Sequence, residues 1–305
     1  RLQGDTLETH AAFWQEKLSG TLPVLALPCD RPRPKSQTYA GSVDLFSLPK
    51  PLTQALLAFA QREGSTLFMV LLTAFNILLY RYSGQEDLLV GTPIANRNQA
   101  EIEGLIGVFI NTLVLRSDLS GNPSVRELLR RVRQTTLEAY SHQDFPFEKI
   151  IESLQLDRDL GQSPQFQVML VLQNQPINDL KLANLKLSAI EFENPISQFD
   201  LTVSLAETEQ GLLGRLEYST DLFDQSTIFR LWGHFQTLLE NIVNSPTLPI
   251  AKVPLLPQTE WQQLTHEWSN SKNYLPFDPQ TIYQRFEAQV KQNPASIAAI
   301  FENQQ

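Results

Sequence analysis

The 305-residue sequence is 42% hydrophobic and 19% charged, a composition typical of globular proteins and not of disordered ones. Its 33 acidic residues outnumber 24 basic ones, and the formal net charge of -9 argues against a nucleic-acid-binding surface. The single cysteine, Cys29, excludes an internal disulfide framework and a cysteine-based zinc site.

The first predicted elements are a helix and an arm. A helix is expected around 7–18. Six of the 19 prolines lie between Pro23 and Pro51, and proline both fixes φ and removes a backbone donor. Residues 23–51 are therefore predicted to form an irregular arm.

The longest uncharged apolar run covers residues 66–80 and is shorter than the roughly 18 residues that a membrane-spanning helix needs. Because it also contains Thr73 and Asn76, we predict a helix buried on most of its circumference, and no membrane partner. The first residues lack the basic and apolar segments of a secretory signal, so a cytoplasmic location is expected. The sequence does not begin with Met, which suggests a piece of a longer polypeptide.

Helical and extended patterns alternate after the arm. Helical spacing and capping residues predict helices from Leu52 to Gly64, over 66–82 with Gly84 as its cap, from the capping-box pair Ser124 and Glu127 onwards, and over 147–154 and 226–243. Apolar runs and period-two alternation predict strands at 87–94, 106–116, 165–173, 185–193, 199–207 and 212–219. This order of elements indicates an α/β fold with a mixed β-sheet covered by helices on at least one face.

A second proline cluster, between Pro246 and Pro294, is typical of an interdomain linker. After it, the pattern predicts a helix at 280–292 and a strand in SIAAIFEN, which ends almost at the end of the chain. A lone helix and strand cannot bury a core, so we interpret this segment as the start of a second domain.

The sequence carries no motif of a known catalytic centre. Its four histidines have no spacing suited to a shared metal ion, and no metal site is expected. GxGxxG, GxxxxGK[ST] and GxSxG are absent, which excludes the usual phosphate-binding loops and the nucleophile elbow.

His142 and Asp144 are the pair that most resembles a general base with a carboxylate partner. A second interpretation is that they cap a helix and hold the turn before Pro146, while Phe145 and Phe147 anchor that turn in the core. We favour the structural interpretation, because closeness in sequence says little about geometry.

Other polar residues lie at strand ends or interrupt strands. Arg97 follows the strand at 87–94, a usual place for a site residue in α/β folds, although an exposed loop arginine fits the pattern equally well. Asn111 interrupts an apolar strand that also carries Arg116, and a buried amide needs hydrogen-bond partners. Asp200 begins a strand, where a carboxylate is more often structural than catalytic.

Several segments together resemble the condensation domain of nonribosomal peptide synthetases. They stand in the order and at about the spacing of that family's later core motifs, and they are IGVFINTLVLR at 106–116, HQDFPFEKI at 142–150 and RDLGQSPQFQVMLVLQN at 158–174. The opening at 13–34 and the segments SQFDLTVSL and 215–239 resemble the rest of the same region, and residues 273–305 resemble the start of an adenylation domain.

The resemblance implies a chloramphenicol-acetyltransferase-like fold of two lobes around a tunnel. It further implies peptide-bond formation between two thioesters, each delivered on the phosphopantetheine arm of a carrier domain, with no cofactor bound directly. The implied partners are an upstream and a downstream carrier domain and an adenylation domain in cis. An epimerisation domain has the same fold but is disfavoured, because an adenylation domain follows.

The family's catalytic HHxxxDG motif is absent from this sequence. The resemblance therefore implies a C-terminal lobe at 1–250 without its N-terminal lobe, a linker at 251–272 and a truncated adenylation domain at 273–305, and it predicts that the chain alone is inactive. By resemblance, Arg97 pairs with the Asp of HHxxxDG, and Asn111 and Asn174 line the tunnel. The remaining motif residues are expected to be structural; they are Arg116, His142, Asp144, Arg158, Asp159, Pro164 and Asp200. A catalytically silent relative that docks carrier or tailoring proteins remains the alternative.

Overall fold

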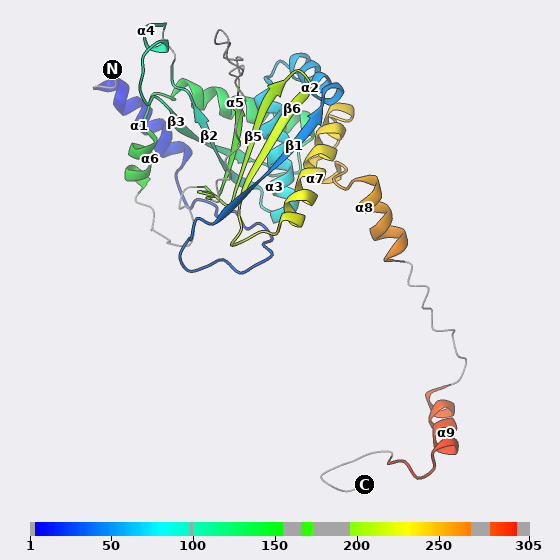
Figure 1. The fold of residues 1–305 in the computed structure, drawn as a ribbon. Helices are drawn as coiled ribbons and strands as arrows, with labels where there is room; N and C mark the ends of the chain where they lie inside the picture. Colours follow the sequence, from blue (N-terminus) through cyan, green and yellow to red (C-terminus); the bar gives the residue numbers. More distant parts are fainter. Residues whose placement is uncertain (1–3, 98–99, 155–165, 174–195, 270–280, 298–305) are drawn as a thin grey trace, which may run out of the picture. The chain divides into compact units, whose positions relative to one another are not determined.

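The computed structural model of the chain describes residues 4–97, 100–154, 166–173, 196–269 and 281–297. The chain divides into two compact units, Arg1–Pro257 and Gln258–Gln305. Figure 1 shows the first unit as a sheet with helices packed on it. The second unit contains α8 (Gln258–Gln262), a π-helical turn at Gln263–Glu267 and α9 (Ile282–Gln292). The predicted helix at 280–292 is thus present.

The first unit is built on a six-stranded sheet with the order β1-β6-β5-β4-β2-β3. The strands are β1 (Gly41–Pro49), β2 (Asp87–Ile94), β3 (Asn111–Asp118), β4 (Val168–Gln173), β5 (Leu201–Thr208) and β6 (Gly211–Ser219). β4 runs parallel to both of its neighbours, β2 and β5, whereas the other pairs are antiparallel. The sheet is therefore mixed, as the sequence predicts.

Helices cover the sheet and one of its edges. Their bounds are α1 (Asp5–Lys17), α2 (Lys50–Arg62), α3 (Leu67–Ser83), α4 (Ala100–Glu103), α5 (Val125–Ser141), α6 (Phe147–Leu154) and α7 (Gln225–Asn244), with a 3-10 turn at Ile250–Lys252. α3 packs against α2, α5, α7, β2 and β4, and so occupies the centre of the helical layer. α1 and α6 contact each other beside β3 (Figure 1).

α3 forms because its apolar run is bounded by strong end signals. The Thr66 side chain accepts a hydrogen bond from the backbone N–H of Met69, and Gly84 ends the helix with φ 72°, a left-handed conformation that favours glycine. Every residue from Leu67 to Leu79 is buried. Full burial of such side chains contributes about 1.5–3 kcal/mol each, so α3 is a main source of the stability of this unit.

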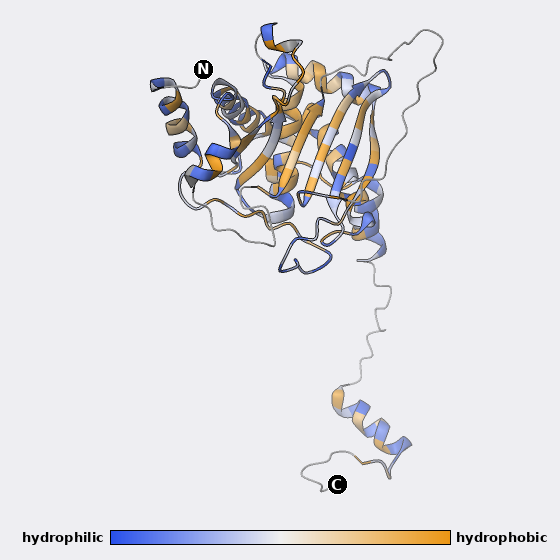
Figure 2. Cartoon of the chain, turned by 60° about the vertical axis from the view of Figure 1, so that its left-hand side comes forward, coloured by the Kyte–Doolittle hydropathy of each residue, from blue (hydrophilic) through white to orange (hydrophobic). Residues whose placement is uncertain are grey.

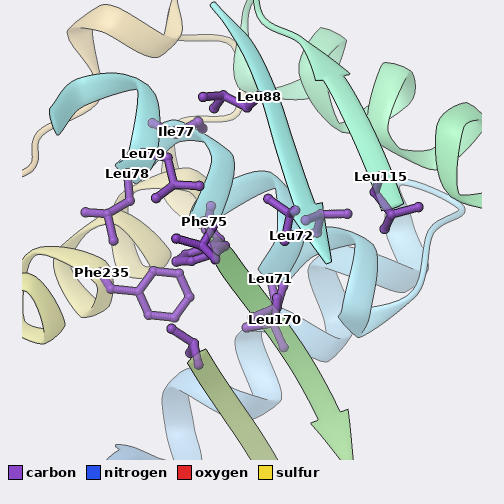
Figure 3. Close-up of a cluster of buried hydrophobic side chains, with 14 of the residues drawn as sticks. Leu71, Leu72, Phe75, Ile77, Leu78, Leu79, Leu88, Leu115, Leu170 and Phe235 are labelled. Carbon is purple, nitrogen blue, oxygen red and sulfur yellow. The ribbon is translucent and has the colours of Figure 1, made fainter. Parts of the chain in front are cut away.

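The core around α3 joins both layers (Figure 3). Phe75 of α3 meets Phe235 of α7 edge to face, with 6.3 Å between ring centroids, and Leu170 of β4 is fully buried in the same cluster. No single helix in the described ranges is long and apolar enough to cross a membrane. α2 and α3 meet that requirement only as a pair, and they are bent by 104° at their junction.

Hydrophobic and hydrophilic residues alternate along the strands (Figure 2). In β6, Leu212 and Leu216 are buried while Leu213 and Arg215 are exposed, which is the pattern of a strand with one covered face.

Two of the predicted boundaries are wrong. Residues 23–51 are not irregular throughout, because 41–49 form β1, which pairs with β6 in full antiparallel register. The predicted strand at 106–116 begins only at Asn111, because its partner β2 ends at Ile94, directly opposite Asn111. The apolar alternation of 106–110 continues without a neighbouring strand, and Ile106 and Val108 are almost fully exposed.

Other predictions are confirmed, refined or not reached. Ser124 caps α5 by accepting from the Glu127 N–H, while the Glu127 side chain pairs with Arg130 and Arg131. The short α4 lacked a sequence signal. The predicted strand at 185–193 and most of SIAAIFEN lie outside the described residues, as do Arg158, Asp159, Pro164 and Asn174.

Candidate functional site

A groove of about 780 Å³ lies where β2 and β4 end. We call it the strand-end groove; its lining residues come from these strand ends, the loop before β3, the first turn of α3 and the end of α5, and they are Phe68, Thr92, Pro93, Ile94, Ala95, Asn96, Arg97, Gly107, Val108, Phe109, Ile110, Tyr140, Gln143, Leu172 and Gln173. β2 and β4 are parallel, and the carboxyl ends of parallel strands are the usual ligand-binding edge of α/β sheets. The groove is therefore the first candidate site.

Arg97, one of the residues that line this groove, holds the loop that precedes β3. Its Nη1 donates to the carbonyls of Ile102 (2.6 Å) and Leu105 (2.9 Å), and its Nη2 donates to the carbonyl of Gly107 (3.3 Å). The guanidinium carbon also lies 4.3 Å from the centroid of the Phe109 ring, a cation–π contact. The exposed apolar residues of the loop are thus presented on a fixed backbone.

Asn96, the residue before Arg97, has φ 51°, in the left-handed region that asparagine tolerates better than most residues. Its Oδ1 atom is buried and has no hydrogen-bond partner within the described part of the chain. A buried carbonyl oxygen of this kind at a groove wall is an acceptor that a ligand or a water molecule can satisfy.

Asn111 binds the backbone of the turn between α5 and α6. Its Nδ2 donates to the carbonyls of Gln143 and Phe145, both at 2.8 Å, and its Oδ1 accepts from the N–H of Phe147 at 3.0 Å. The side chain is only 9% exposed. All three bonds serve one segment, so the structure shows Asn111 organising a turn whose Gln143 lines the strand-end groove.

His142 ends α5 and packs against α1. Its Nδ1 lies 2.8 Å from Nδ1 of His10, and its ring stacks on Phe13 with 3.9 Å between centroids. Burial, reinforced by the neighbouring His10, lowers the pKa of His142. Asp144 is exposed. The contact between the two histidines joins residues far apart in the sequence, and no local pattern predicts it.

A second groove, of about 530 Å³, lies between α1, the strands β2 and β3, and α5. We call it the ion-pair groove; its lining residues are Phe13, Trp14, Lys17, Asp87, Val114, Arg116, Asp118, Arg131, Gln134, Thr135, Glu138 and Ala139. Half of them carry charge, and the charges pair with one another across the groove.

Arg116 is the centre of the ion-pair groove. Its Nε and Nη2 donate to the Asp87 carboxylate at 3.0 and 2.7 Å, and its Nη1 donates to the carbonyls of Ser19 (2.9 Å) and Lys17 (3.3 Å). The bond to Asp87 raises the pKa of Arg116. Lys17 also contacts Glu138 at 2.7 Å and lowers the pKa of that carboxyl. These contacts attach the end of α1 to β3 of the sheet and to α5.

Asp200 directly precedes β5, whose start lies away from the strand-end groove because β5 runs parallel to β4. The Arg33 guanidinium donates to both of its carboxylate oxygens, one of them at 2.9 Å, and only 6% of the Asp200 side chain is exposed. The pair fixes the arm to the start of β5. Within the described ranges, no cluster of three or more His, Cys, Asp or Glu side chains is arranged to hold a metal ion.

The family model described as "Condensation domain" matches residues 1–265. The chain belongs to the condensation domain family. The resemblance that the sequence motifs suggested is thereby confirmed, whereas the adenylation segment at 273–305 stays a prediction. The α/β fold class, a chloramphenicol-acetyltransferase-like lobe with a mixed sheet covered by helices, is confirmed by the solved condensation-type structures that share it.

The curated relatives are very large synthases. One of the linear gramicidin synthase proteins of Brevibacillus parabrevis is 47% identical over 301 residues, which is 98% of this chain and 4% of that protein. Malpinin synthetase of Mortierella alpina is 41% identical over 303 residues, 99% of this chain and 4% of that protein. The chain thus spans only a few per cent of the length of the curated relatives that it matches.

Solved structures agree with this assignment. The crystal structure of the X-domain from teicoplanin biosynthesis is 28% identical with a TM-score of 0.77, and the match covers 83% of this chain and 58% of that chain. The four-domain nonribosomal peptide synthetase holo-AB3403 has a TM-score of 0.75 over 84% of this chain and 21% of that one, at 24% identity, which supports the fold alone.

Proposed function

We propose that this chain is the C-terminal lobe of a nonribosomal peptide synthetase condensation domain and works in the cytoplasm. In this proposal, the amine of one carrier-tethered aminoacyl group attacks the thioester carbonyl of another. The C–S bond breaks, an amide bond forms, the amine loses a proton and the donor's thiol is released. The observation that carries the proposal is the family match over 1–265 together with the strand-end groove inside it.

The exposed loop before β3 supports a second lobe. Ile106, Val108 and Ile110 are 105%, 94% and 69% exposed, and Arg97 donates hydrogen bonds to the backbone of the same loop. A fixed and exposed apolar segment is typical of an interaction surface. We propose that this loop contacts an N-terminal lobe that carries HHxxxDG.

Within this arrangement the chain supplies the wall and not the base. The proposed base is the second histidine of HHxxxDG, and we retain the proposal that Arg97 pairs with the Asp of that motif. Asn111 positions the turn at Gln143, and Asn174 is proposed to line the tunnel. Holding two tethered reactants in one tunnel turns their encounter into an intramolecular step, which accounts for much of the rate. The phosphopantetheine arms belong to the carrier domains and enter as part of the substrates.

The domain division is likewise a proposal, with a linker at 251–272 and the start of an adenylation domain at 273–305. In support, the first compact unit ends at Pro257. The proposed partners in cis are that adenylation domain and the two carrier domains. The alternative, a silent docking module, predicts a degenerate HHxxxDG upstream of Arg1. The coding sequence over about two hundred upstream codons, one further domain-sized lobe, therefore separates the two proposals.

The direct test joins this chain at Arg1 to an N-terminal lobe with intact HHxxxDG, taken from a linear gramicidin synthase condensation domain. Dipeptide formation is measured with aminoacyl groups loaded on two carrier domains. We expect product from the joined protein, none from the chain alone, and none when the second histidine is replaced by Ala. Product from the chain alone would contradict the proposal, and a cooperatively folded joined protein without product would favour the docking module.

Arg97 provides the finer test in the same joined protein. Arg97→Ala is expected to abolish product, because it removes both the loop contacts and the proposed partner of the motif's Asp. Arg97→Lys keeps the charge but cannot bind three carbonyls in the same planar geometry. An Arg97→Ala protein with the full rate would show that the residue has no part in catalysis.

A further inference from the structure

The strand-end groove has an almost uncharged lining. Polar and apolar groups contribute about equally to the wall, and the apolar ones include Ile94, Val108, Phe109 and Leu172. The polar groups are amides and hydroxyls, and burial raises the pKa of Tyr140, which keeps its phenol neutral at physiological pH. Arg97 is the only charged side chain among the described lining residues.

The charge of Arg97 is engaged by the loop before β3, and in the proposed function its further partner is the Asp of HHxxxDG. Its guanidinium donates to three loop carbonyls and lies on the Phe109 ring. No carboxylate belongs to the described lining, so a cationic ligand group would find no counter-ion there. It would also meet the positive charge of Arg97, and like charges at close range repel.

We propose that the strand-end groove receives the side chain of one aminoacyl thioester, and that this side chain is uncharged. The inference rests on the proposed function and names its substrate class. A charged side chain would lose water without gaining a free opposite charge, because the described lining has no carboxylate and the Arg97 guanidinium is already engaged, and this is costly. An uncharged one avoids that cost, and its carbon atoms gain from burial against the apolar part of the wall, which includes Ile94, Phe109 and Leu172. A volume of about 780 Å³ falls in the range of small-molecule sites and accommodates any such side chain.

The ion-pair groove shows that this neutrality is local. Six charged side chains line it, including Lys17, Arg116 and Glu138, although the two grooves lie on the same lobe. It therefore supplies a control surface whose lining is charged.

The test measures binding of non-hydrolysable aminoacyl pantetheine amides to the intact chain by ligand-observed NMR. Two pairs of probes differ in charge at similar size: norleucyl against lysyl, and leucyl against aspartyl. We expect each charged probe to bind at least ten-fold more weakly than its neutral partner. Binding of either charged probe within about three-fold of its partner would overturn the inference.

A matched pair of variants locates the effect. Gln143→Glu places a carboxylate in the strand-end groove, and Gln134→Glu makes the same change in the ion-pair groove. Gln143→Glu is expected to reduce the norleucyl-to-lysyl preference at least five-fold, because it supplies the missing counter-ion, whereas Gln134→Glu should leave it unchanged. Equal effects of the two variants, or none from Gln143→Glu, would contradict the assignment to this groove.

The two levels of the proposal fail differently. If no probe of either charge binds but the joined protein makes dipeptide, the assignment to this groove is wrong and the proposed function stands; if the joined protein makes no dipeptide, the proposed function fails. If all probes bind equally and the joined protein still makes dipeptide, the proposed function stands and only the side-chain class is wrong.

Discussion

The two grooves of this lobe use polar side chains in opposite ways. At the strand-end groove, Arg97 and Asn111 turn their donors toward backbone carbonyls of the neighbouring loops. At the ion-pair groove, Arg116 and Lys17 bind carboxylates that stand on the groove wall itself. The first groove thus has one charged side chain, Arg97, among its described lining residues, whereas six charged side chains that pair with one another line the second.

The comparison teaches that a rigid site does not need charged walls. Hydrogen bonds from one side chain to several carbonyls of one loop fix that loop and leave the rest of the described lining to uncharged groups. Ion pairs between lining residues also hold a groove together, but their charged groups then form part of its surface. Substitutions at the first groove should therefore alter ligand binding, and substitutions at the second only stability.

The largest effect is expected for Asn111→Ala. It removes three hydrogen bonds and leaves two carbonyls and one N–H of the 143–147 turn without their partner, a cost of about 2–4 kcal/mol in the free energy of unfolding. Urea unfolding measures the loss, and norleucyl-probe binding should weaken as well. Thr112→Ala, on the same strand, is the matched control. Equal free energies of unfolding for Asn111→Ala and Thr112→Ala would contradict the role of Asn111 in holding the turn.

Arg116→Met should have a smaller effect, about 1–2 kcal/mol in the free energy of unfolding, because the lost contacts with Asp87 and two carbonyls are partly exposed to solvent. Probe binding in the strand-end groove should not change. Arg116→Lys should recover part of the stability but not the two-pronged geometry. Weaker probe binding in Arg116→Met would show that the two grooves are coupled.

The next effect concerns the pH dependence of stability and involves His142, which connects the two grooves. Its ring stacks on Phe13 of the ion-pair groove, and it directly precedes Gln143 of the strand-end groove. Its folded-state pKa is lowered, first by burial and then by His10, while Glu138 opposes the shift. The unfolded chain therefore binds more protons near the ordinary histidine pKa of about 6.5. Stability should be lost as the pH falls from that value through the lower folded pKa.

Urea midpoints at pH 7.5 and 5.5 measure this loss, and His142→Gln should flatten the difference. The carboxyl groups with lowered pKa, such as Glu63 and Asp118, titrate below this window and do not interfere. An unchanged pH dependence in the variant would assign the loss to another group.

Lys17→Met should have the smallest effect, about 0.5 kcal/mol, because the side chains of Lys17 and Glu138 are 43% and 32% exposed and surface ion pairs contribute little. The difference should shrink as salt is added. Lys252→Met serves as a control at another exposed lysine. A cost above about 2 kcal/mol would show that the ion-pair groove matters more than its exposure suggests.

Local patterns predicted α3 and β2 well, because an apolar run between Thr66 and Gly84 and a short buried strand carry their signals in neighbouring residues. β1 escaped prediction because its stability comes from β6, far along the chain, while the prolines around it resemble those of a loop. Alternation at 106–110 predicted a strand that is absent, because the partner strand ends at Ile94.

The sequence predicted which residues belong to the site, but it did not predict the groups that those residues contact. Arg97 and Asn111 stand out from sequence because one follows a buried strand and the other interrupts an apolar one. Their acceptors are backbone carbonyls, which every residue has, so no sequence feature marks them. The pairing of His10 with His142 depends on the packing of α1 against the end of α5, and pairings of that kind follow from the fold alone.

The attachment of α1 bears on how such segments are exchanged between related proteins. Trp14 donates to the carbonyl of His142 at 3.2 Å, and Arg116 donates to the carbonyls of Lys17, the last residue of α1, and of Ser19, so this helix depends on residues about a hundred positions later. A crossover point between α1 and β1, at residues 19–40, would combine α1 from one parent with the sheet and α5 from another, and the contacts between them would then come from different proteins. Parents recombined before Asp5 would instead pass the helix and its binding surface on together.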